Sequence, residues 1–155
     1  MASASEISNA LAGAMADQIT VKLDSGDVGG ILNVYDDSGG VPANCEAANT
    51  GVLLGTIALP DPAFGGFTDT NPGARVTLLG VPLSDTDCDA SGTALYYRGY
   101  SCNTAQTDAN KVTCFIQGSA GEAADSTDLT IDNKVVVQTG TLTVTGWVVN
   151  VPESA

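Results

Sequence analysis

The chain has 155 residues, of which 43% are hydrophobic, and its 18 acidic and 5 basic residues give a net charge of −13. This length and apolar content predict one domain with a hydrophobic core, not a disordered chain. The negative charge disfavours nucleic-acid phosphates and anionic membranes as partners. Because the chain contains no histidine, Ser-His-Asp and Cys-His catalysis are excluded, and the commonest metal ligand is absent.

Targeting segments are not expected. No apolar run approaches the roughly 20 residues that a membrane helix needs. The first 17 residues have no basic residue and no long apolar core, unlike a secretory signal. We therefore expect synthesis in the cytoplasm without Sec export.

A short amphipathic helix is predicted at the N-terminus, over residues 3–18. Ser3 and Glu6 have capping-box spacing. Three apolar residues then recur every four positions and form one stripe: Ile7, Leu11 and Met15. The stripe either packs on its own domain or docks as an arm on a neighbouring subunit. We divide the single domain into this arm, 1–18, and a β domain, 19–155.

The remainder reads as short strands separated by turns rich in Gly, Asp, Asn and Pro. The expected strands cover residues 19–23, 31–35, 52–59, 75–81, 93–100, 111–117, 129–131, 135–138 and 141–151. The strands at 93–100 and 111–117 pair as a hairpin with a long loop. The pattern predicts a mostly β, single-domain antiparallel sandwich or small barrel with a short N-terminal α-helix.

An acidic loop is the first candidate for chemistry. Asp85, Asp87 and Asp89 alternate as at the start of an EF-hand, where such side chains converge on calcium. The sixth position is Ala90 instead of Gly, and the twelfth is Tyr96 instead of Glu. The preferred interpretation is a solvated acidic turn, with no metal and no cofactor required.

Four cysteines form the second candidate set. Their spacing contains no C-x-x-C pair, which disfavours structural zinc and a redox dithiol. Cys102 and Cys114 lie on the two arms of the predicted hairpin, so they could pair and leave Cys45 and Cys88 to join two loops. Four reduced thiols, made in a cytoplasm, are the alternative.

The last strand carries the only tryptophan. Strict alternation places Trp147 and Val149 on a Thr-lined face, opposite a core face that includes Leu142 and Val144. Trp147 then either lies under the helix or a loop, or anchors a contact with a partner. Tyr96, Arg98 and Tyr100 share one face of another strand, where Arg98 stacks on tyrosine or pairs with an acid.

Several short segments, in order, resemble a family of small proteins encoded in the structural gene blocks of tailed bacteriophages. They are residues 30–36 (GILNVYD), 42–43 (PA), 50–54 (TGVLL), 59–64 (LPDPAF), 89–94 (DASGTA), 96–98 (YYR), 117–119 (QGS), 128–129 (DL) and 135–152. The N-terminal helix also fits. The resemblance implies a virion structural protein and brings no catalytic residues, and it gives the cysteines and the acidic loop no role.

The expected function is therefore that of a capsid decoration, or cement, protein and not an enzyme. It would sit on the capsid surface, bind the major capsid protein and form a homo-oligomer, with a trimer favoured. The expected contact residues are Ile7, Leu11, Met15, Trp147 and Val149. One alternative is a tail or head–tail structural or receptor-facing protein. Another is a calcium-dependent or carbohydrate-binding module or enzyme, since two carboxylates can hydrolyse a glycoside.

Overall fold

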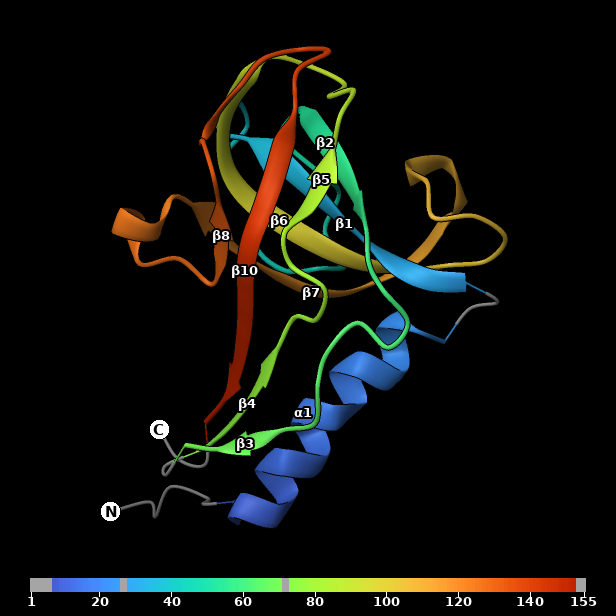
Figure 1. Ribbon diagram of the computed structural model, residues 1–155, viewed down its shortest axis with the longest axis vertical. Helices are drawn as coiled ribbons and strands as arrows, with labels where there is room; N and C mark the ends of the chain where they lie inside the picture. The colour runs from blue at the N-terminus through green and yellow to red at the C-terminus, as the bar shows by residue number, and fades with distance from the viewer. Residues whose placement is uncertain (1–6, 26–27, 71–72, 153–155) are drawn as a thin grey trace.

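The computed structural model describes residues 7–25, 28–70 and 73–152. In this part of the chain, one α-helix is set against one strongly curled sheet (Figure 1). The elements in chain order are α1 (Asn9–Leu23), β1 (Val28–Asp36), β2 (Leu53–Ala58), β3 (Thr68–Asp69), β4 (Ala74–Thr77), β5 (Leu83–Asp85), β6 (Gly92–Cys102), the short 3₁₀ helix η1 (Asp108–Asn110), β7 (Lys111–Gly121), the 3₁₀ helix η2 (Ala123–Asp125), β8 (Leu129–Ile131), β9 (Val135–Val136) and β10 (Leu142–Val151).

The strands follow the order β2-β1-β6-β7-β8-β10-β4-β3, with β5 also paired to β10 and β9 to β6. Neighbouring strands run antiparallel except β7 and β8, which are parallel. The sheet curls into a half-barrel, and the curl brings β5 against β2 (Figure 1). The expected fold class, mostly β with an N-terminal helix, is confirmed. Of the two expected forms, sandwich or small barrel, the curled mixed half-barrel is nearer to the barrel.

The helix begins and ends later than predicted. The Ser8 hydroxyl caps it by accepting a hydrogen bond from Leu11 N at 3.3 Å. The expected capping box, Ser3 and Glu6, lies outside the described residues. The helix continues to Leu23, so the boundary at residue 18 and the strand expected over 19–23 are wrong. Continuing the helix carries Leu23 to a fully buried position in the core, and this burial outweighs the β-propensity of the local sequence.

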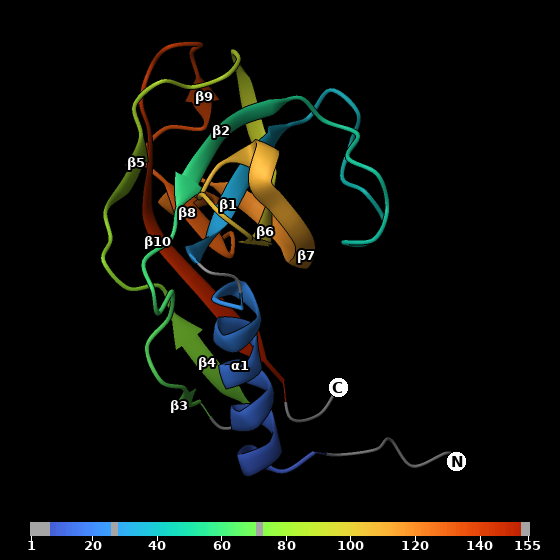
Figure 2. The same cartoon turned by 90° about the vertical axis from the view of Figure 1, so that its right-hand side faces the viewer.

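The buried face of α1 is also not the predicted one. Ala12 and Ala16 are fully buried, whereas Leu11 and Met15 are 49% and 47% exposed. Small side chains let the helix approach β4 and β10 closely, and Figure 2 shows α1 lying against these strands. The fit is tight, because a Cβ added at Gly13 would lie 2.5 Å from the ring of Phe67. The larger residues of the predicted stripe therefore remain at the flank of the contact.

Trp147 lies at the centre of the core and has no exposed surface. Its ring packs edge-on against Phe64 and Tyr97, with centroid separations of 4.7 and 5.1 Å. Its Nε1 donates a 2.9 Å hydrogen bond to the Tyr97 hydroxyl, so the buried indole N–H is satisfied. The expectation that Trp147 anchors a partner is therefore wrong for this fold, and the alternative of a buried Trp147 holds.

A bulge explains why alternation misplaced Trp147. Val144 is opposite Ile131, but Gly146 is already opposite Thr130, so β10 holds one extra residue at this point. The insertion reverses the alternation, and Trp147 and Val149 join Leu142 and Val144 on the buried side. Val149 is only 9% exposed and is likewise unavailable as a surface contact.

Candidate functional site

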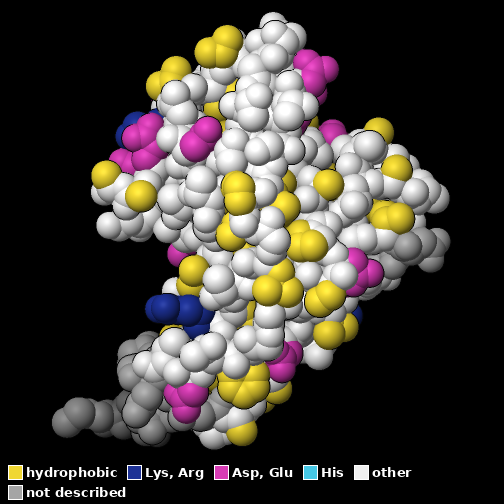
Figure 3. All heavy atoms as spheres, viewed as in Figure 1, with side chains coloured by type: hydrophobic (Ala, Val, Ile, Leu, Met, Phe, Trp, Pro, Cys, Tyr) yellow, Lys and Arg dark blue, Asp and Glu magenta, His cyan; other side chains and the backbone are white. Residues whose placement is uncertain are grey.

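Exposed apolar side chains gather on the face of the half-barrel shown in Figure 3. There the chain between β2 and β3 runs beside the chain between β4 and β5, and the two are joined by a 2.9 Å hydrogen bond from Leu79 N to Ala63 O. Phe67, Leu79 and Val81 remain 43%, 40% and 39% exposed. We define the apolar patch by Leu79 and Val81 together with Pro60 and Leu83, which flank Gly80. Phe67 is not counted in the patch, because its ring lies against Gly13 of α1.

The residue pattern did not predict the apolar patch, because Leu79 and Val81 fall within the strand expected over 75–81, where apolar residues read as core, and Pro60 and Leu83 fall outside the expected strands. The only available signal was a pair of large apolar side chains around a glycine, Leu79-Gly80-Val81. Turn-forming segments normally expose polar side chains. Large exposed apolar side chains that gather on one face mark candidate contact surfaces.

A second apolar surface lies on α1. Viewed down the helix, Leu11 and Gly13 are each rotated by about 100° from Ala12, in opposite directions. Because Gly13 faces the Phe67 ring, Leu11 and Met15 lie on the opposite flank of α1. Their exposure leaves them accessible to a partner. Ile7 is different, because it is partly buried against the core. The expected stripe is thus split between an exposed pair and a residue that packs on its own domain.

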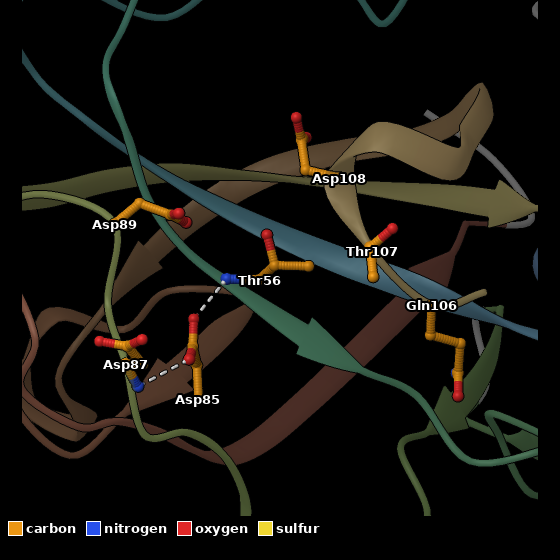
Figure 4. A pocket seen from close by; sticks show the side chains of 7 residues that line it. All are labelled: Thr56, Asp85, Asp87, Asp89, Gln106, Thr107 and Asp108. Carbon is orange, nitrogen blue, oxygen red and sulfur yellow. Dashed lines mark hydrogen bonds between the residues drawn. The ribbon is translucent and has the colours of Figure 1, made fainter.

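The acidic loop lies at the seam between β2 and β5, where it lines a shallow pocket (Figure 4). Asp85 Oδ2 accepts a 2.9 Å hydrogen bond from Thr56 N, on the edge of β2. Its other oxygen accepts from Asp87 N at 3.0 Å. The Asp85 side chain thus takes the place of a neighbouring strand at this edge of β2. A main-chain hydrogen bond from Asp89 N to Leu54 O also joins the acidic loop to β2 and helps to close the seam.

Metal binding at this pocket is not supported. Within the described ranges, no group of three or more His, Cys, Asp or Glu side chains is arranged to hold a metal ion. Asp85 already accepts two main-chain hydrogen bonds, and Asp87 is exposed. Partial desolvation, together with the charges of Asp85, Asp108 and Asp87, raises the pKa of Asp89. The carboxylates therefore repel one another at the seam, and calcium binding by Asp85, Asp87 and Asp89 stays a prediction.

Residues 37–52 form a long connection between β1 and β2, here called the cover loop, which lies over the outer face of β6 and β7. Arg98, on β6, is only 3% exposed beneath it. Its Nη1 and Nη2 donate to the carbonyl oxygens of Ala47 and Asn44, and its Nε donates to Gln117 Oε1, each at 2.9 Å. Neither ion pair found within the described residues includes Arg98, so the guanidinium is satisfied mainly by the loop's own backbone.

Tyrosines complete the layer under the cover loop. Tyr35 stacks on Tyr96 at 5.0 Å, and the Tyr96 hydroxyl accepts a hydrogen bond from Gly51 N. The Tyr35 hydroxyl accepts from Asn49 Nδ2 at 3.0 Å. Burial, reinforced by the neighbouring Tyr100 hydroxyl, raises the pKa of Tyr35 far above its ordinary value. The Tyr35 phenol is therefore neutral, and the hydroxyl groups of Tyr35 and Tyr96 fix the loop by accepting its hydrogen bonds.

All four cysteines are free thiols in this structure, and the pairing of Cys102 with Cys114, which packs against the cluster that contains Cys102, stays a prediction. Cys102 is fully buried and lies opposite Lys111, while Cys114 lies opposite Tyr100. Cys88 is buried near the seam, where burial and then the charges of Asp85 and Asp89 raise its pKa. A further side-chain neighbour of Cys114 is Cys45, in the cover loop.

Comparisons of this chain with protein-family models, with curated proteins and with solved structures find no match. No helix in the described ranges is long and apolar enough to cross a membrane. The features that bear on function are two exposed apolar areas on a strongly acidic protein, a loop fixed by a buried arginine, and a seam closed by a carboxylate.

Proposed function

We propose that this protein is a structural component of a tailed-phage virion, a capsid decoration protein that binds the major capsid protein through its apolar patch. The observation that carries the proposal is the exposure of Leu79 and Val81, each about two-fifths exposed, beside Pro60 and Leu83 in the apolar patch. Completing their burial against a partner contributes about 1 kcal/mol per side chain. The resemblance of the short segments described above to phage structural proteins supports the same role.

The remaining surface suits this role. A net charge of −13 keeps the protein away from the packaged nucleic acid and from anionic membranes. The protein acts without a cofactor and without catalysis. Its copies associate, as a trimer at local symmetry positions of the capsid, and the exposed pair Leu11 and Met15 provides the contact between copies. After synthesis in the host cytoplasm, the protein resides on the capsid surface.

A capsid-binding assay with matched variants tests the proposal. Purified protein is mixed with capsids that lack it, and the bound copies are counted by quantitative mass spectrometry and located by cryo-EM. Val81→Asp places a charge in the patch and should reduce binding at least 10-fold. Val137→Asp is the control, because Val137 is 62% exposed and lies outside the patch. Circular dichroism checks that both variants keep the fold.

Two outcomes would contradict the proposal. Equal binding by Val81→Asp and Val137→Asp would remove the apolar patch from the contact. A reconstruction of virions with the protein confined to the tail would replace the decoration role by a tail or head–tail role.

A further inference from the structure

The cover loop places Cys45 at a fixed position on the sheet. Arg98 donates to the carbonyl oxygens of Asn44 and Ala47, on either side of Cys45, each at 2.9 Å. Gln117 Nε2 donates to Pro42 O at 2.7 Å, so the loop is also tied to β7. Cys45 is therefore held by hydrogen bonds to two neighbouring strands, and its thiol is partly exposed.

A bulge in β7 turns Cys114 toward the same loop. Ile116 lies opposite Gly99, but the next pair joins Cys114 to Tyr100, which leaves Phe115 as the extra residue. Opposed residues share a face of the sheet, so Cys114 points to the outer side with Tyr100. Without the bulge, alternation would have turned it toward the core side with Gly99, whose neighbours include Trp147.

The two cysteines meet on the outer face of the sheet, because Arg98 holds the loop residues on either side of Cys45 and Cys114 precedes Gln117, the strand partner of Arg98, on that face. Burial, followed by a hydrogen bond with the Cys45 thiol, raises the pKa of Cys114 to about 12. The positive charge of Arg98 acts in the opposite direction on the same group. Cys45 and Cys114 are both partly accessible, whereas Cys88 and Cys102 are 2% and 0% exposed. The accessible pair is thus also the pair that meets on this face.

We propose that Cys45 and Cys114 form a disulfide when the protein meets an oxidising environment, and that this bond fastens the cover loop to β7. A low-molecular-weight disulfide such as oxidised glutathione is the oxidant. One cysteine thiolate attacks it and releases one glutathione thiol, and the second cysteine thiolate then resolves the mixed disulfide and releases the other. Two protein thiols lose their protons and two electrons pass to glutathione. The proposal does not depend on the virion role.

Peptide mapping after redox equilibration tests the pairing directly. The full chain is incubated over a range of reduced-to-oxidised glutathione ratios, alkylated, and digested with trypsin without reduction. Cleavage after Lys22, Arg75, Arg98, Lys111 and Lys134 places each cysteine on its own peptide, which makes the pairing unambiguous: 23–75, 76–98, 99–111 and 112–134.

We expect peptide 23–75 linked to peptide 112–134 in monomeric protein, while Cys88 and Cys102 remain alkylated. Cys45→Ser and Cys114→Ser should each abolish the link, and Cys102→Ala should keep it. The oxidised wild type should melt about 5–10 °C above the reduced form, since the bond closes a long loop. A link between 99–111 and 112–134, a link found only between two chains, or four alkylated thiols under the most oxidising conditions would each overturn the proposal.

Discussion

Replacing Arg98 by methionine should destabilise the protein through the cover loop. Methionine preserves most of the apolar stem of Arg98 but removes its three hydrogen bonds, to Asn44 O, Ala47 O and Gln117 Oε1. Hydrogen bonds from a charged donor each contribute about 1.5–3 kcal/mol. Part of this lost stability is offset, because wild-type Arg98 is only 3% exposed and the variant avoids the desolvation cost of burying its charge. The expected net loss is about 3 kcal/mol of unfolding free energy.

Urea unfolding followed by circular dichroism measures this loss. Arg75→Met is the matched control, because Arg75 is an exposed arginine that donates to Asn150 Oδ1, and its replacement should cost less than about 0.5 kcal/mol. Hydrogen exchange should locate the effect of Arg98→Met in residues 37–52. If the two variants were equally stable, or if exchange in the cover loop did not change, the guanidinium would not be what holds the loop.

Three further predictions concern the seam, the acid response and the core. Asp85→Ala removes the acceptor of Thr56 N and should cost about 1–3 kcal/mol in urea unfolding, against less than about 0.5 kcal/mol for Asp87→Ala; equal losses would refute closure of the seam by Asp85. Desolvation opposes ionisation of Asp36, but hydrogen bonds from Ser38 and Val52 N outweigh it and lower its pKa, so its contribution is present above about pH 4 and lost as pH falls through the lower folded value. The stability difference between wild type and Asp36→Asn should therefore shrink from about pH 5 to about pH 2, and a constant difference would contradict this assignment. Trp147 fluorescence should be blue-shifted and resist acrylamide quenching until unfolding, and Trp147→Phe should cost roughly 2 kcal/mol; quenching of the native protein as strong as that of the unfolded chain would show that Trp147 is not buried.

The strands were predictable because their β-branched and aromatic runs lie between strong turn signals. The β6–β7 hairpin, for example, follows from two such runs around a polar turn. The errors arose where one residue changes the register. Bulges at Thr145 and Phe115 reverse the side-chain alternation, and they decide the orientations of Trp147 and Cys114. Bulges depend on the fit of neighbouring strands, so the residue pattern of a single strand does not reveal them.

The helix shows a different limit. Periodicity identified its existence, but the large residues Leu11 and Met15 dominated the predicted stripe, while the structure buries Ala12 and Ala16. Hydrophobic size predicts which residues gain most from burial, yet close approach of a helix to a sheet favours small side chains at the contact. The apolar patch was missed for a related reason. Leu79 and Val81 fall in the strand expected over 75–81, and only the fold brings Pro60 to the same place.

Several aspartate side chains stabilise the fold by accepting main-chain hydrogen bonds, in addition to giving the protein its negative charge. Beyond the sheet ladders, several main-chain N–H groups are satisfied by aspartates: Ala63 by Asp24, Val52 by Asp36, Thr56 by Asp85, Glu122 by Asp125 and Thr143 by Asp132. A curled sheet with short strands leaves N–H groups without a ladder partner at its ends, and an unpaired buried N–H costs about 1–3 kcal/mol. By contrast, β6, β7 and β10 contain no acidic residue. The acid surplus therefore lies where the sheet is incomplete. Hydrogen bonds lower the pKa of Asp36 and Asp125, so protonation of these two groups at low pH should loosen their loops before it disturbs the long strands.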